Sequence, residues 1–419
     1  MKNRIIRDRK DLSNLVLERK KASDVKIAVE EILERVKEAG DVALIKYSNE
    51  FDKANFSSPK DFVVSKEEIE ESIDVVGEEF ISAVNMAIKN IRDFYSRMPR
   101  PQNWFYLKNG KLSGQMVVPL ESVGIYVPGG RAPYPSTVMM AAIPAQIAGV
   151  KRIVVTTPKP VPEVLAVCKL LDIYEVYRLG GAHAIAGLAY GTDTITRVDK
   201  IVGPGNRFVV SAKKYVFGET GIEMIPGPSE IVVLADSNAN PKFVAIDLLS
   251  QAEHDPLAMS ILVTDSEDLA NRVIEEMGIL IRELSTCETA KESWESWGGI
   301  VLVNSIDEGI DTVNFIAPEH LELQIKNPAS YLEKIRNAGT IFIGEKTPEA
   351  IGDYIAGSSH ILPTGGSARF SSGLNVLDFL KLINITQYNE ITEDFKSGSI
   401  IADREGFSAH KKSLEIRDR

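Results

Sequence analysis

Residues 122–158 read SVGIYVPGGRAPYPSTVMMAAIPAQIAGVKRIVVTTP, and this stretch decides the fold class. Its first eight residues, SVGIYVPG, are an apolar run that ends in a proline-glycine turn, as a buried strand does. The run STVMMAAIPAQIAG predicts a helix, and KRIVVTTP predicts a second strand. A strand, a helix and a second strand at this spacing are typical of a parallel sheet covered by helices.

The same alternation continues toward the C-terminus. YEVYRLGG and DKIVGPGN predict further strands, each followed by a helical segment. After the loop EMIPGPSE the pattern resumes with the predicted strands IVVLAD, MSILVTD, GIVLVNS, LELQI and GTIFIGE. We therefore predict an α/β fold with two Rossmann-like parallel-sheet domains, related by an old duplication, with small helical extensions at both ends.

The changes in pattern along the chain place the domain boundaries. Residues 1–24 form an N-terminal extension with a short strand and an amphipathic helix. The first α/β domain is discontinuous and consists of residues 25–121 and 233–370. Residues 122–232 form the second α/β domain, and residues 371–419 form a helical tail.

Composition excludes several classes of protein. A chain of 419 residues is longer than one hydrophobic core usually serves, and its net charge of −11 argues against a general nucleic-acid binder. The longest apolar run, residues 138–150, is too short to span a bilayer, and we see no secretory signal. Two cysteines cannot build a disulfide framework. We expect a cytoplasmic protein.

Gln251 and His254 end a helical segment, DLLSQAEH, just before an apolar strand. Three residues apart, they project from one face of a helix. One interpretation is a solvated helix terminus, where the helix dipole favours histidine. The other is half of a metal site, because zinc accepts nitrogen and oxygen ligands. Asp353 and His410 could complete that set.

Glu319 and His320 are adjacent at a turn that enters a predicted strand. A carboxylate beside an imidazole suits proton removal and water activation near neutral pH. The alternative is an ordinary strand start with a turn carboxylate, and both interpretations stay open at this point.

Three glycine-rich turns each follow a predicted strand and precede a predicted helix. They lie at residues 127–130, 179–183 and 203–206. Such turns present backbone N–H groups to a phosphate at a helix N-terminus, although none matches the G-x-G-x-x-G fingerprint. They indicate nucleotide or phosphate binding, against the alternative of simple tight turns.

Taken together, seven stretches resemble the histidinol dehydrogenase family over essentially the whole chain. They are VGIYVPGG (123–130), VDKIVGPGN (198–206), GPSEIVVLAD (227–236), DLLSQAEHDP (247–256), APEHLEL (317–323), GDYIAGSSHILPT (352–364) and EGFSAHK (405–411). The resemblance implies a zinc- and NAD-dependent enzyme that oxidises L-histidinol through L-histidinaldehyde to L-histidine with two NAD, the last step of histidine biosynthesis. It also implies a homodimer in which the C-terminal segment completes the partner's site.

The resemblance further implies roles for individual residues. One zinc ion per subunit would be held by Gln251, His254, Asp353 and His410. Glu319 and His320 match the catalytic pair. Beyond the metal ligands and His320, the substrate contacts would be Ser229, Tyr354, His360 and Glu405. The NAD contacts would be Tyr126, His183 and Asn206.

His183 departs from the family pattern, because many relatives have glutamine at this position of the GGA-Q-AIA segment. Histidine can still donate a hydrogen bond to the cofactor. The sequence leaves the choice between NAD and NADP open, since a 2′-phosphate needs a basic partner.

Three rival functions remain at this stage. A zinc hydrolase would use Glu319 as its base but would leave the glycine turns without a role. A non-catalytic nucleotide-binding protein would not need Glu319, His320 and the zinc ligands. A paralogue would oxidise another amino alcohol with the same residues.

Overall fold

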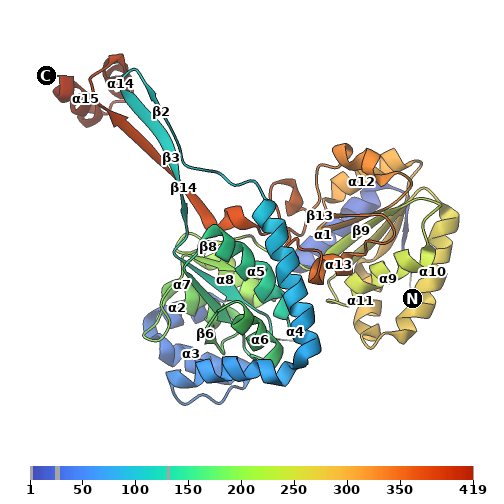
Figure 1. Ribbon diagram of the computed structural model, residues 1–419. Helices are drawn as coiled ribbons and strands as arrows, with labels where there is room; N and C mark the ends of the chain where they lie inside the picture. Colours follow the sequence, from blue (N-terminus) through green and yellow to red (C-terminus); the bar gives the residue numbers. More distant parts are fainter. Residues whose placement is uncertain (1–2, 24–28, 130–132, 419) are drawn as a thin grey trace. The chain divides into compact units, whose positions relative to one another are not determined.

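The computed structural model describes residues 3–23, 29–129 and 133–418. It contains two parallel sheets and confirms the predicted α/β class (Figure 1). The smaller parallel sheet has the strand order β6-β5-β4-β7-β8. Its strands are β4 (Ser122–Tyr126), β5 (Arg152–Thr156), β6 (Glu175–Tyr177), β7 (Lys200–Val202) and β8 (Gly221–Ile222).

Helices connect the strands of this sheet, as the alternating pattern predicts. They are α5 (Pro135–Ala148), α6 (Pro162–Leu170), α7 (Gly181–Tyr190) and α8 (Arg207–Val216). Helix α5 is buried along most of its length and ends at Gly149, whose φ of 97° favours glycine. Apolar residues on nearly every side of α5 are what a helix packed between a sheet and other helices requires.

Three N-terminal helices pack onto this smaller sheet, and their placement corrects a predicted boundary. They are α2 (Glu30–Ala39), α3 (Asp41–Tyr47) and α4 (Lys66–Arg97). Helix α2 lies against α7, and α4 lies against α5 and α6. Leu33 and Leu44 share a buried core with Ile185 and Ile201. The prediction that residues 25–121 join residues 233–370 was therefore wrong for these helices, because their apolar stripes face the other sheet.

The larger parallel sheet has the order β1-β11-β10-β9-β12-β13. Its strands are β1 (Ile5–Ile6), β9 (Glu230–Ala235), β10 (Met259–Thr264), β11 (Gly299–Leu302), β12 (His320–Gln324) and β13 (Thr340–Ile343). Its helices are α1 (Arg9–Ser23), α9 (Pro241–Ala252), α10 (Glu267–Leu280), α11 (Cys287–Trp297), α12 (Ile306–Ile316) and α13 (Glu349–Tyr354).

Both faces of the larger sheet are buried, which explains the continuous apolar strands. On β9, Ile231 and Val233 join the core formed with α9, α10 and α11. The alternate residues Val232 and Leu234 join the core formed with α1 and α12. Successive side chains of a strand point to opposite faces, so this sheet is the middle of three layers.

A separate unit consists of residues 99–120 and 379–419. It contains an antiparallel sheet of order β14-β3-β2, built from β2 (Trp104–Lys108), β3 (Lys111–Pro119) and β14 (Leu380–Tyr388). Helices α14 (Glu393–Arg404) and α15 (Ser408–Glu415) follow. The prediction of a purely helical tail was wrong, because Leu380–Tyr388 pairs along its whole length with β3. Among the described helices, none is both long and apolar enough to cross a membrane.

Candidate active site

A cleft of about 2650 Å³ lies between the two parallel sheets. On the smaller sheet, the cleft is lined by segments that follow β4, β6 and β7, at the carboxyl ends of these strands. On the larger sheet, it is lined by segments that precede β9, β10 and β12, at the amino ends of these strands. Ten residues singled out from the sequence line it: Tyr126, His183, Asn206, Ser229, His254, Glu319, His320, Asp353, Tyr354 and His360.

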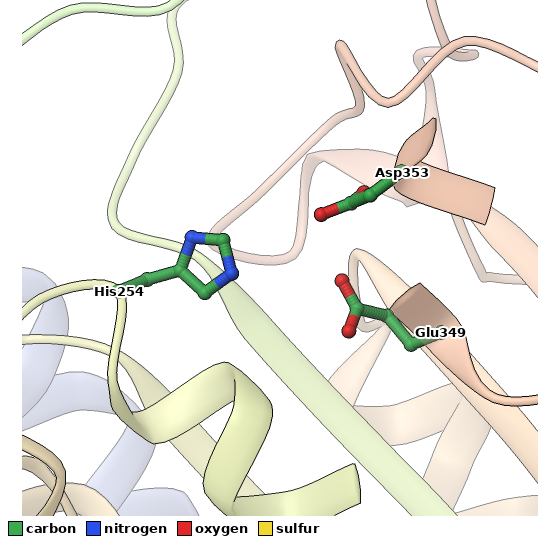
Figure 2. A group of neighbouring side chains, drawn as sticks. All are labelled: His254, Glu349 and Asp353. Atoms are coloured by element: carbon green, nitrogen blue, oxygen red, sulfur yellow. The ribbon is translucent and has the colours of Figure 1, made fainter. Parts of the chain in front are cut away.

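Three side chains with metal-binding atoms, His254, Glu349 and Asp353, lie close together, and His254 and Asp353 line this cleft. His254 comes from the segment after α9, whereas Glu349 and Asp353 come from α13 (Figure 2). One ligand atom from each lies within 4.8 Å of the other two. The sequence analysis missed Glu349, although its spacing from Asp353 places both on one face of a helix. Glu349 is 1% exposed, and its Oε1 atom has no hydrogen-bond partner among the described residues.

Gln251 and His320 contact each other beside this cluster. Gln251 is fully buried in α9, and its Oε1 atom lies 2.9 Å from His320 Nδ1. The backbone carbonyl of Glu230 lies 3.2 Å from the same nitrogen. Because a carbonyl oxygen only accepts, Nδ1 carries the proton and Nε2 holds the lone pair. His320 Nε2 lies 3.9 Å from Glu349 Oε1 and 4.0 Å from Asp353 Oδ1.

Burial keeps His320 in its neutral form. Removal of the ring from water, together with the nearby His254, lowers the pKa of His320 to about 3. A neutral imidazole with a free Nε2 can accept a proton throughout the neutral range.

Glu319 faces the cleft from the residue before β12. It is 5% exposed, and its Oε2 atom accepts a hydrogen bond of 2.9 Å from the backbone N–H of Glu230. Burial raises the pKa of Glu319 well above its usual value, and the negative charges of Glu230 and Asp353 add to this rise. A cation beside these carboxyl groups would lower their pKa values again.

The residues fit a divalent metal ion. A buried carboxylate, a partly buried carboxylate and an exposed imidazole, with a buried amide close by, form a nitrogen-oxygen donor set suited to zinc. Several of their polar atoms have no partner in the described part of the chain, namely Glu349 Oε1, Gln251 Nε2 and His320 Nε2. Unpartnered buried polar atoms are costly, and a bound ion and substrate would supply partners.

Metal binding should release protons at neutral pH. Burial raises the pKa of Glu349 to about 8 and that of Asp353 to about 6, so without metal the pair holds a proton at pH 7. A metal ion must displace it, so we expect about one proton released per Zn²⁺ and an affinity that increases with pH toward 8. Calorimetry at pH 7 in two buffers of different ionisation enthalpy measures this number. Release should fall in Glu349→Gln, and no release from the unmodified protein would contradict the protonated pair.

Ser229, Tyr354 and His360 surround the same part of the cleft. His360 Nδ1 lies 3.1 Å from the backbone carbonyl of Asp353, which connects its ring to α13. Tyr354 ends α13 and is 61% exposed, and Ser229 precedes β9. These side chains offer hydrogen-bonding groups near the candidate metal-binding residues His254, Glu349 and Asp353.

The opposite wall of the cleft carries the predicted cofactor residues. Tyr126 ends β4, and its hydroxyl accepts a hydrogen bond from the backbone N–H of Gly181. Asn206 caps α8 by accepting hydrogen bonds from the N–H groups of Phe208 and Val209. Of the predicted glycine turn at 127–130, Gly130 lies outside the described residues.

His183 lines the cleft wall from α7 but is almost fully buried, at 1% exposed. Its Nε2 atom lies 3.1 Å from Ser48 Oγ and 3.4 Å from Asp52 Oδ2. Its Nδ1 atom has no hydrogen-bond partner among the described residues, so one polar atom remains for a ligand.

A buried ion pair supports the turn that carries Asn206. Lys213 of α8 contacts both carboxylate oxygens of Glu223 at 2.7 Å and donates to the carbonyl of Gly203. Glu223 also accepts from the N–H of Gly203 at 2.8 Å. Both side chains are 0% exposed, so the turn is held by charges with no access to water.

Two predicted site residues, Glu405 and His410, belong to the second unit. Glu405 follows α14 and His410 lies in α15, and both are exposed. His410 stacks near Phe407, with ring centroids 5.2 Å apart. Their roles at a metal and substrate site stay predictions.

Comparison with known proteins decides the family. A family model described as histidinol dehydrogenase matches residues 17–418. The chain belongs to the histidinol dehydrogenase family. It is therefore an NAD-dependent oxidoreductase, which excludes a non-catalytic nucleotide-binding protein.

Relatives in this family match nearly the full chain. Histidinol dehydrogenase of Clostridium acetobutylicum is 46% identical, over 95% of this chain and 93% of its own length. That of Thermotoga maritima is 45% identical over 94% of each chain. The crystal structure of histidinol dehydrogenase from Elizabethkingia anophelis has a TM-score of 0.90 at 35% identity and covers 100% of this chain and 98% of its own.

Proposed function

We propose that the protein oxidises L-histidinol through L-histidinaldehyde to L-histidine, with one zinc ion per subunit and two NAD, as the last step of histidine biosynthesis. The observation that carries the proposal is the position of His320 Nε2. This unprotonated nitrogen lies about 4 Å from the carboxylates of Glu349 and Asp353, in a cleft whose far wall carries the glycine-rich turns proposed to bind the nucleotide.

Gln251, His254 and Asp353, with His410 of the partner subunit, would hold the zinc ion. Glu349 offers a further carboxylate oxygen to the same site. When bound, zinc supplies a Lewis acid that orients the imidazole and amino groups of the substrate. Ser229, Tyr354, His360 and the partner's Glu405 would then bind the substrate's remaining polar groups.

His320 would act as the base in the first oxidation. Its Nε2 atom would accept the hydroxyl proton while a hydride leaves the adjacent carbon for NAD. Each NAD, when bound, would accept one hydride, so the two oxidations would use two NAD in succession. Gln251 Oε1 and the Glu230 carbonyl hold Nδ1–H, so the ring keeps the tautomer that this step needs. Tyr126, His183 and Asn206 would contact NAD from the opposite wall.

Glu319 would prepare the second oxidation. Its carboxylate removes a proton from water as the water adds to the aldehyde, and the hydrate that forms is the second hydride donor. The hydrogen bond from Glu230 N–H holds one oxygen and leaves the other for water. The cleft would hold the aldehyde beside Glu319 between the two steps.

The stoichiometry of the reaction tests the proposal. With limiting L-histidinol and excess NAD, we expect two NADH and one histidine per histidinol, lost on chelation and restored by Zn²⁺. A zinc hydrolase would form no NADH, and a paralogue would form NADH from another amino alcohol instead. One NADH per histidinol with accumulating aldehyde would contradict the four-electron reaction.

A further inference from the structure

Arg19 of α1 lies far along the chain from every residue assigned to the reaction, yet it contacts two segments of the site, residues 228–230 and Leu257. Its Nη2 atom donates to the backbone carbonyls of Pro228 and Ser229 at 2.6 and 3.0 Å. Its Nε atom donates to the carbonyl of Leu257 at 2.8 Å. Its Nη1 atom lies 2.5 Å from Glu230 Oε2.

Glu230 extends these contacts to the reacting groups. Its Oε1 atom accepts a hydrogen bond of 3.0 Å from the backbone N–H of Gly365. Its own N–H donates to Glu319 Oε2, and its carbonyl faces His320 Nδ1. One residue thus holds the carboxylate of Glu319 and the tautomer of His320.

The burial of this pair indicates what it is for. Arg19 is 4% exposed and Glu230 is 1% exposed, so their charges attract at short range without water. A buried ion pair adds little net stability compared with apolar residues of the same volume. A guanidinium, however, presents five donors in a fixed plane, and here four acceptors on two segments, residues 228–230 and Leu257, use them.

We propose that Arg19 and Glu230 are positioning residues that fix Glu319, His320 and the Ser229 segment relative to one another. Neither side chain lines the cleft, so neither needs to touch the substrate. The pair acts through the backbone of residues 228–230, from which the hydrogen bonds to Glu319 and His320 depart. This inference rests on the proposed function for the roles of those two residues.

Three variants and a control test the pair. Arg19→Lys keeps the charge but cannot reach all four acceptors, and Arg19→Met leaves Glu230 buried and unpaired. The double variant Arg19→Met/Glu230→Gln removes both charges. Lys21→Met removes an exposed charge from the same helix and should leave activity unchanged. Thermal midpoints and kcat and KM for L-histidinol and NAD are measured for each.

We expect Arg19→Met to lose stability and the double variant to regain most of it. In Arg19→Lys and in the double variant, kcat should stay about 10–100-fold low, because displacement of reacting groups by about 1 Å costs on that scale. In these variants, KM for NAD should change by less than about twofold, because Tyr126 and Asn206 lie on the opposite wall of the cleft. Recovery of kcat together with stability in the double variant would show a purely structural pair and overturn the inference.

Hydrogen exchange separates this inference from the proposed function. Amides of residues 229–232 and 364–366 should exchange faster in the double variant than in the unmodified protein, whatever the substrate is. Unchanged exchange there would overturn the positioning role. If the unmodified protein fails to oxidise histidinol but these amides respond, the substrate proposal fails and the pair still holds the segment.

Discussion

Glu319→Gln should stop the conversion of aldehyde to acid while leaving the first oxidation largely intact. Glutamine keeps the size of the side chain and can still accept the hydrogen bond from Glu230 N–H, but it cannot take a proton from water. Loss of a positioned general base typically costs 10²–10⁴-fold, so we expect the second step to slow by about that factor. The NADH yield should fall from two toward one per histidinol.

Separate assays of the two steps measure this effect. L-histidinol and L-histidinaldehyde are supplied in turn, and aldehyde and histidine are quantified. Glu333→Gln makes the same change at an exposed position and should leave both steps unaffected. Equal losses in both steps would contradict a role for Glu319 that is confined to the activation of water.

Lys213→Met should destabilise the protein more than any other single change to the cofactor wall. It leaves the Glu223 carboxylate, 0% exposed in the ion pair, without its cation. Breaking a buried pair in this way costs about 3–5 kcal/mol, because the remaining charge stays out of water. Lys213→Met/Glu223→Gln should recover much of the loss, since no unpaired charge remains.

Urea unfolding gives the free energies for this comparison. The midpoint should fall in Lys213→Met and rise again in the double variant, whereas Lys291→Met, which removes an exposed charge from α11, should stay within about 0.5 kcal/mol of the unmodified protein. A loss below about 1 kcal/mol in Lys213→Met would mean that water reaches Glu223.

Local patterns in the sequence were sufficient to predict the fold class. The apolar runs that became β4, β5, β9 and β10 lie between helices at spacings that only a covered parallel sheet satisfies. The alternation in Leu380–Tyr388 was also readable as a strand, yet the charged helices that follow it led to a helical prediction.

The placement of the site depended on contacts between distant segments. His320 starts β12 and pairs with Ile231 of β9, so Glu319 and Glu230 meet at the amino ends of these strands. Ligands of open α/β sheets usually lie at carboxyl ends, and sequence offers no local signal for the exception. Glu349 was different, because its four-residue spacing from Asp353 was visible in the sequence.

Ala317 adopts a backbone conformation that is uncommon for a residue with a side chain. It ends α12 with a φ of 56°, a conformation that glycine adopts more easily. A glycine here would avoid the crowding of a Cβ atom two residues before Glu319.

The cleft lies at the carboxyl ends of the strands of one sheet and at the amino ends of the strands of the other. This arrangement has a consequence for protein engineering. The turns proposed to bind the dinucleotide follow strands of one sheet and the proposed proton-transfer residues precede strands of the other, so each wall has its own framework and its own buried ion pair. Libraries aimed at cofactor preference can therefore be confined to residues 122–226. Libraries aimed at new alcohols can be confined to the residues around α13, and variants selected for each property can then be recombined.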